Sequence, residues 1–111
     1  MARPRILIAD DEEGIRESLS LILGDLYDLT FVQDGQQALE ALQAPQCDMV
    51  LLDIKMPKMD GLEVLRTLKR QGHSDLPPVM MLTAYQSVEL AKEAVKLGAC
   101  DYLPKPFERE Q

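Results

Sequence analysis

Five short apolar runs divide this chain, and each is nearly continuous rather than alternating with polar residues. Strands that are covered on both faces show this pattern, because neither side of such a strand meets water. Between the runs, apolar residues recur at the three- and four-residue spacing of amphipathic helices. The sequence therefore predicts alternating strands and helices, with strands at residues 6–9, 29–32, 49–52, 79–82 and 102–104.

Four amphipathic helices are expected between these strands. Asp34 and Asp60 are each followed three residues later by Gln or Glu, which is typical of a capping box, and Ser87 can cap the last helix. Glycine ends helices readily because it adopts left-handed dihedrals without a Cβ penalty. The expected stops are Gly24, Gly72 and Gly98, and the expected buried stripes are Ile15, Leu19, Ile22 and Leu23, then Ala38, Leu39 and Leu42, then Leu62, Leu65 and Leu68, then Val88, Ala91, Ala94 and Val95.

Alternating strands and helices with short connections favour right-handed crossovers and a parallel sheet. We therefore expect an α/β fold, a doubly wound parallel five-stranded sheet with a ligand cleft beyond the strands' carboxyl ends. Only residues 108–111 follow Phe107, too few for a stable helix. The last helix is expected to be largely missing, which would leave the last strand poorly covered and open to self-association.

Length and charge limit the possible functions. With 111 residues the chain is expected to be one domain, residues 1–111. Its net charge of −7 argues against direct contact with nucleic acid or an anionic membrane, and no run approaches the ~20 apolar residues of a membrane span. Cys47 and Cys100 lack metal-ligand spacing, so we expect both to be packed, reduced thiols of a cytosolic protein.

Chemically active residues follow four of the five runs. Asp10 and Asp11 follow the first run, Asp53 the third, Thr83 the fourth and Lys105 the fifth. Because parallel strands end on the same edge of a sheet, these residues are expected to converge. The alternative is that aspartates after strands only form turns or cap helices, which is plausible for the first two. It explains Asp53 poorly, because a loop rather than a helix start follows it.

Three carboxylates about 4 Å apart would repel by about 4 kcal/mol per pair, so a cation is expected among them. Magnesium fits this all-oxygen set better than zinc, which prefers thiolate and imidazole ligands. A hydroxyl from Thr83 and an ammonium from Lys105 would complete a pocket for a phosphoryl group, with one carboxylate placed to attack it. A single lysine is more often a surface residue, but the flanking Pro104 and Pro106 restrict the backbone around Lys105 and favour the functional interpretation.

At this point the chain resembles the receiver domain of two-component response regulators, over essentially its whole length. The resemblance implies the flavodoxin-like form of the doubly wound sheet, (βα)5. Residues 82–85 and 101–107 of this chain are also similar to the receivers of transcription activators of the nitrogen-regulator type. The segments that carry it are IADDE (8–12), LLDIKMPKMDG (51–61), MLTA (81–84) and DYLPKPF (101–107).

The resemblance assigns roles at the metal and phosphoryl sites. It implies that Asp53 accepts a phosphoryl group from a sensor histidine kinase. Asp11, Asp53 and the backbone carbonyl of Lys55 would bind Mg²⁺, and Asp10 would act mostly through a metal-bound water. The remaining phosphoryl contacts would come from Thr83, Ala84 and Lys105, where Ala84 is small enough to leave access to Asp53.

The resemblance also implies a switch and its tuning. Tyr102 would turn inward when Thr83 moves toward the phosphoryl group, although an ordinary strand aromatic is an equally good reading of Tyr102. The side chains of Lys55 and Tyr85 would tune hydrolysis of the aspartyl phosphate. A cis peptide is implied between Lys105 and Pro106.

Two other classes remain as alternatives. A phosphohydrolase of the haloacid-dehalogenase type shares the strand-end aspartate and magnesium, but it needs a second aspartate where this chain has Lys55. A flavin carrier needs a phosphate-binding loop after the first strand, and residues 10–13 are all acidic. The expected function is therefore a phosphorylation-operated signalling switch rather than a turnover enzyme, with an output domain beyond Gln111 for which DNA binding is plausible.

Overall fold

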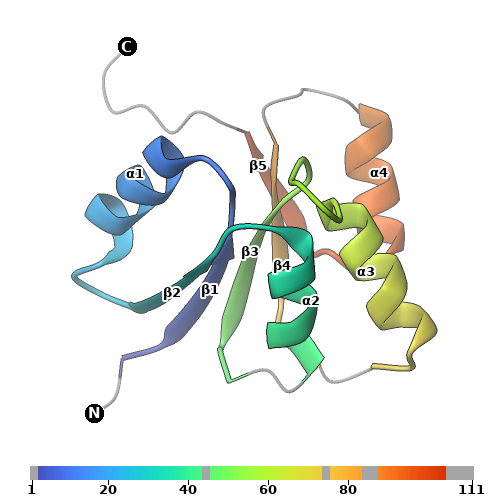
Figure 1. The fold of residues 1–111 in the computed structure, drawn as a ribbon, viewed down its shortest axis with the longest axis horizontal. Coiled ribbons are helices and arrows are strands. Elements are labelled where there is room, and N and C mark those ends of the chain that lie inside the picture. The colour runs from blue at the N-terminus through green and yellow to red at the C-terminus, as the bar shows by residue number, and fades with distance from the viewer. Residues whose placement is uncertain (1–2, 44–45, 74–75, 84–87, 105–111) are drawn as a thin grey trace.

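The computed structural model describes residues 3–43, 46–73, 76–83 and 88–104, which form a five-stranded parallel sheet with helices on both faces (Figure 1). The predicted doubly wound α/β class is confirmed, and each observed strand is one residue longer than its apolar run. The strands are β1 (Arg5–Ala9), β2 (Asp28–Val32), β3 (Met49–Asp53), β4 (Val79–Thr83) and β5 (Asp101–Pro104), and the helices are α1 (Glu13–Leu23), α2 (Gly35–Gln43), α3 (Gly61–Arg70) and α4 (Val88–Lys96).

The strand order is β2-β1-β3-β4-β5, so the chain reverses direction across the sheet between β2 and β3. β1 pairs with β2 on one side and with β3 on the other, and Ala9 lies opposite both Val32 and Leu52. The carboxyl ends of β1 and β3 therefore form the topological switch point, where doubly wound sheets bind their ligands.

Two apolar layers of unequal size hold the sheet between its helices. Side chains alternate between faces along a strand, so Leu7 and Ala9 pack into the larger layer with α2, α3 and α4, whereas Ile6 and Ile8 pack into the smaller one with α1. Leu19 is the buried residue that α1 contributes. Figure 1 shows the same asymmetry, with α1 alone on one side and α2, α3 and α4 on the other.

The predicted helix boundaries are mostly confirmed. The Asp60 side chain accepts a hydrogen bond from the Glu63 backbone N–H at 2.8 Å, and the Asp60 N–H donates to the Glu63 carboxylate at 3.0 Å, which makes a complete capping box. Asp34 caps α2 through the Gln37 N–H at 2.8 Å. Two of the expected glycine stops have positive φ, 81° at Gly72 and 109° at Gly98. Ser87 lies outside the described residues.

The reason given for Gly24 is wrong, because its φ is −65°, an ordinary right-handed value. The chain instead continues in a tight turn, in which the Gly24 N–H donates to the Ser20 carbonyl at 2.9 Å. A Cβ at this position would lie 2.5 Å from that oxygen. Glycine is therefore required by close approach of the backbone and not by its left-handed freedom.

Three residues predicted to be packed are exposed. Val95 is 56% exposed because it lies one residue past Ala94, and the helix turns it away from the sheet. Ile22 is 48% exposed because it lies at the edge of the apolar face of α1, where it is only partly covered. Cys100 is exposed directly before β5, whereas Cys47 is half-buried, and burial raises the pKa of its thiol. Both thiols are free, as predicted.

An apolar groove of about 480 Å³ opens beside α1, on the face that carries the smaller layer. Its floor includes Ile6 of β1, Leu51 of β3 and Met80 of β4, and its rim includes Ile22. The predicted poor cover concerned the last strand, β5, and no described residue of β5 lines this groove, so that prediction stays untested. The predicted absence of a last helix concerns residues after 104, which lie outside the described residues. No helix in the described ranges is long and apolar enough to cross a membrane.

We predict that this groove drives weak self-association. The weight-average mass from light scattering should rise with protein concentration, because apolar surface leaves water when two copies meet. Ile22→Glu places a charge at the rim and should keep the chain monomeric. Leu21→Glu is the matched control, since Leu21 is 81% exposed on the same helix and does not line the groove. A wild-type chain that stays monomeric at high concentration contradicts the prediction.

Candidate functional site

Three aspartates meet at the switch point between β1 and β3. Carboxylate oxygens of Asp10, Asp11 and Asp53 all lie within 4.8 Å of one another. Asp10 is fully buried and Asp53 is 2% exposed, whereas Asp11 is exposed. The predicted convergence of these residues is therefore confirmed. Two buried carboxyl groups and one exposed one place the base of the cluster inside the protein and open its other side to solvent.

Strand pairing explains why the cluster forms. Ala9 lies opposite Leu52, so the next residue of each strand, Asp10 and Asp53, emerge side by side. The hydrogen bonding of the sheet extends to these ends, because the Asp10 N–H donates to the Val32 carbonyl at 3.1 Å and the Ile54 N–H to the Leu82 carbonyl at 3.0 Å. The two carboxylates are thus fixed by backbone that the sheet holds rigidly.

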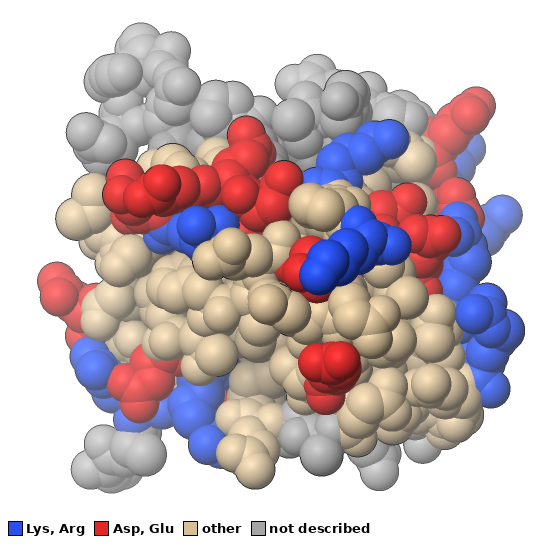
Figure 2. Space-filling view, in the orientation of Figure 1, with Lys and Arg blue, Asp and Glu red and all other residues tan. Residues whose placement is uncertain are grey.

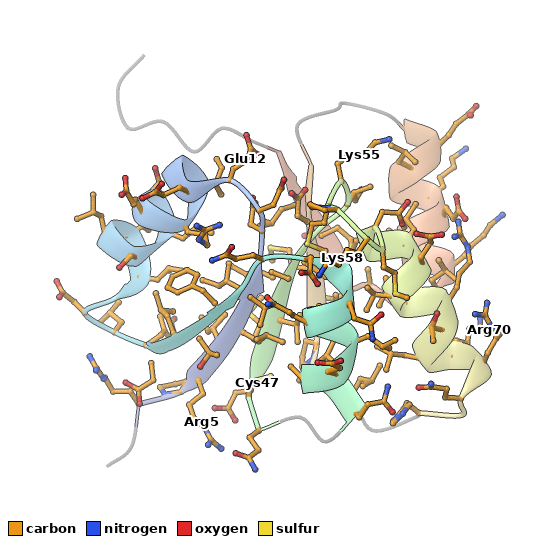
Figure 3. The ribbon with its side chains drawn as sticks, viewed as in Figure 1. Arg5, Glu12, Cys47, Lys55, Lys58 and Arg70 are labelled. Atoms are coloured by element: carbon orange, nitrogen blue, oxygen red, sulfur yellow. The ribbon has the colours of Figure 1, made fainter. Side chains whose placement is uncertain are left out.

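The chain turns sharply after β1, which brings Asp11 to the surface. Asp10 Oδ1 accepts a hydrogen bond from the Glu12 N–H at 2.8 Å, and the Arg16 guanidinium donates to the Asp10 carbonyl at 2.9 Å. These bonds fold residues 10–12 back toward the start of α1. Figure 2 shows acidic side chains gathered on the upper left of the molecule, above α1, and Figure 3 shows Glu12 at the same end.

The cluster is chemically suited to a small hard cation. Two unit charges at 4.8 Å repel by about 3 kcal/mol at the effective dielectric of a protein surface, and this repulsion acts between each pair. A divalent cation removes that cost, and an all-oxygen donor set with an exposed side matches magnesium, which keeps some of its waters. Isolated acidic groups on a surface often hold no ion, but here two of the three are buried.

The loop from Ile54 to Asp60 shapes the other wall of the site. The Lys55 N–H approaches Asp53 Oδ1 at 3.3 Å, and the Gly61 N–H donates to the Ile54 carbonyl at 2.8 Å. A Cβ on Gly61 would lie 2.2 Å from the Asp53 carbonyl oxygen, so only glycine lets α3 begin this close to Asp53. From the sequence, Gly61 was recognised only within the segment 51–61 and given no packing role, so this requirement was missed.

The other predicted site residues are described only in part. The backbone of Thr83 ends β4 one residue beyond Leu82, which pairs with Asp53, so Thr83 lies on the same edge. Tyr102 lies inside β5 opposite Met81. No side-chain position is described for either residue. The remaining predictions lie outside the described residues, namely Ala84, Tyr85, Lys105 and Pro106, with the cis peptide predicted between the last two.

The chain with this doubly wound sheet and this cluster of aspartates at the switch point also matches a known family by its sequence. The chain matches the response regulator receiver domain over residues 6–111. It is 44% identical over 108 residues to response regulator MprA of Mycolicibacterium vanbaalenii, which covers 96% of this chain and 46% of that protein. The chain thus spans about half the length of the curated relatives it matches.

Solved structures agree with this match. The Francisella response regulator 1452 receiver domain has a TM-score of 0.84 at 34% identity, over 96% of this chain and 87% of that one. The Mn²⁺-bound form of response regulator Rcp1 has a TM-score of 0.83 at 27% identity, over 96% and 84%. The chain belongs to the receiver domain family of two-component response regulators, so it is a signalling module and the predicted resemblance is confirmed.

We predict that Mg²⁺ raises the thermal midpoint of the protein, because it offsets the repulsion among the three aspartates. Asp53→Asn should raise the metal-free free energy of unfolding by at least about 1 kcal/mol, since the repulsion of Asp53 with two neighbouring carboxylates is removed, and should weaken the response to Mg²⁺. Scanning calorimetry with and without Mg²⁺ measures both effects. Asp25→Asn, on an exposed turn, is the control. The interpretation is wrong if Mg²⁺ stabilises Asp53→Asn as strongly as wild type.

Proposed function

We propose that Asp53 accepts a phosphoryl group from a sensor histidine kinase in a Mg²⁺-dependent reaction. The observation that carries this proposal is the position of Asp53, 2% exposed at the end of a central strand, with two other carboxylates within 4.8 Å. The family assignment supports it, because receivers are the phosphorylated partners of two-component systems. Residues 1–111 would act as one receiver domain in the cytoplasm.

In the proposed reaction a carboxylate oxygen of Asp53 attacks the phosphorus of a phosphohistidine. The bond from phosphorus to the imidazole nitrogen breaks, the imidazole leaves with the electron pair, and an aspartyl phosphate forms. Asp11 and Asp53 would hold Mg²⁺ with the backbone carbonyl of Lys55, and Asp10 would contribute from the outer sphere. Bound Mg²⁺ supplies positive charge that offsets the negative charge of the phosphoryl oxygens and carboxylates.

The remaining roles follow from the ends of β4 and β5. Thr83 and the backbone N–H of Ala84 would donate hydrogen bonds to the phosphoryl oxygens, and Lys105 would neutralise them. The backbone of Thr83 lies on the Asp53 edge of the sheet, which supports its part of the proposal. We propose that Thr83 moves toward the new acceptor oxygens and that Tyr102 fills the space, so that the signal travels along β4 and β5.

The signal would pass to an output domain beyond Gln111. Curated relatives such as MprA are about twice as long as the matched region, which leaves room for such a domain. A net charge of −7 argues against nucleic-acid contact by the receiver itself, so a DNA-binding function would belong to the output domain. The receiver would catalyse only its own phosphotransfer and slow dephosphorylation.

Incubation with acetyl phosphate and Mg²⁺ tests the central claim. We expect intact-mass spectrometry to show one added phosphoryl group, with acetate as the leaving group, and no added mass in Asp53→Asn. Asp25→Asn should be phosphorylated like wild type, since it lies on an exposed turn. Continuous release of inorganic phosphate far above one equivalent would instead indicate a phosphohydrolase. Phosphoryl gain that persists in Asp53→Asn rules out this residue as the acceptor.

Hydrolysis of the aspartyl phosphate gives a second test. We propose that Tyr85 shields the phosphoryl group from water, so Tyr85→Ala should shorten the lifetime of the phosphorylated protein by about tenfold. The decay is followed by mass spectrometry after the acetyl phosphate is removed. Tyr85→Phe, which keeps the ring, is the matched variant and should decay like wild type. An unchanged rate in Tyr85→Ala excludes shielding.

A further inference from the structure

The loop after Asp53 is held from outside the site by the start of α2. The Gly35 N–H donates to the Pro57 carbonyl at 3.4 Å. A Cβ on Gly35 would lie 1.7 Å from the Met59 carbonyl oxygen and 2.5 Å from its carbon, so no side chain fits between helix and loop. The loop backbone thus rests directly on the first residue of α2, which carries none of the predicted site residues.

The same loop contains the one residue other than glycine with positive φ in the described part of the chain. Lys58 has a φ of 71°, and the Met59 N–H donates to the Pro57 carbonyl at 2.7 Å across it. A bond between residues two apart around such a φ is the geometry of a γ-turn, which is rare and strained. Strained backbone persists only where neighbouring structure holds it, and it is concentrated at functional sites.

Asp34 makes a second contact with this turn, through the side chain of Lys58. Its carboxylate is nearly buried, and one oxygen caps α2 through the Gln37 N–H at 2.8 Å. The other oxygen lies 3.6 Å from the Lys58 ammonium. Figure 3 shows Lys58 beside the start of α2. One carboxylate therefore fixes the helix start and draws the strained turn onto it.

The loop connects these contacts with α2 to the aspartate cluster. Lys55 lies three residues before Lys58, and its N–H approaches Asp53 Oδ1 at 3.3 Å. The far end of the loop is fixed where the Gly61 N–H meets the Ile54 carbonyl at 2.8 Å. Both ends of the loop are attached to the end of β3. The contact between the loop and the start of α2 therefore fixes the middle of the loop, and with it the orientation of the backbone around Lys55.

We propose that Asp34 and Gly35 are positioning residues for the cation site. By seating the γ-turn at Lys58 on α2, they orient the loop around Lys55 and so raise the affinity of the three aspartates for Mg²⁺. This inference rests on the proposed function, because it assumes that the cluster binds Mg²⁺. Groups that orient metal ligands from outside the coordination sphere commonly change metal affinity by about 10- to 100-fold.

Calorimetric titration with Mg²⁺ tests directly whether the contact between Gly35 and the loop matters for Mg²⁺ affinity. Gly35→Ala inserts a methyl group where the Met59 carbonyl lies, so the loop must shift, and the dissociation constant should rise by about tenfold. Gly14→Ala is the matched control, since a Cβ there meets no atom within 4 Å. Circular dichroism checks that each variant is folded at the titration temperature. A folded Gly35→Ala with wild-type Mg²⁺ affinity overturns the proposal.

Charge variants test it where Gly35→Ala does not fold. Lys58→Ala removes a positive charge from the loop that follows Asp53, and the loss of a positive charge by long-range electrostatics alone would strengthen Mg²⁺ binding. Positioning predicts the opposite, about threefold weaker binding, because the turn loses its hold on Asp34. Asp34→Asn keeps the cap acceptor for Gln37 and should weaken binding to a similar extent. The double variant should be no weaker than either single one.

The outcomes separate the two claims. A wild-type chain without saturable Mg²⁺ binding contradicts the proposed function. If wild type binds Mg²⁺ and Lys58→Ala binds it more tightly, only the positioning role fails. Additive losses in the Asp34→Asn and Lys58→Ala double variant also overturn it, because independent effects would show that the two residues do not act through one turn.

Discussion

The parallel pairing of β1 with β3 is the contact on which the site depends. These strands are separated in the chain by a strand and two helices, yet Ala9 lies opposite Leu52, and the next residue of each strand is a buried aspartate. A register shift of one residue would turn each side chain to the other face of the sheet. The apolar layers on both faces fix this register, so core packing and the placement of charge are one constraint.

Most of the fold was predictable because its signals are local. A buried strand reads as a continuous apolar run, and the capping box at Asp60 requires only a residue three positions away. The errors concern properties that depend on packing and exact backbone geometry, which residue types alone do not show. Ile22 has apolar helical spacing but lies at a rim with little to cover it, and Gly24 is glycine because of a close backbone approach.

The residues of the site also fall into a group that the sequence predicts and a group that it does not. Asp10, Asp11 and Asp53 could be predicted because strand ends of a parallel sheet share an edge, and the structure brings them together. The roles of Gly35 and Gly61 could not be predicted, because each meets a backbone carbonyl from a different part of the chain. An Asp-Gly pair before a helix looks like a cap in sequence, whereas the space denied to a Cβ is visible only once the elements are packed.

The two apolar layers differ in size, and this difference affects how easily each helix unfolds locally. The side of the sheet that packs α1 has a small buried cluster, whereas α2, α3 and α4 share a large one, so amide protons of α1 should exchange with solvent faster than those of α3. Asp11 lies at the α1 side and Asp53 at the end of a strand central to both layers. An ion held between them would tie the less stable layer to the more stable one and slow exchange in α1 most.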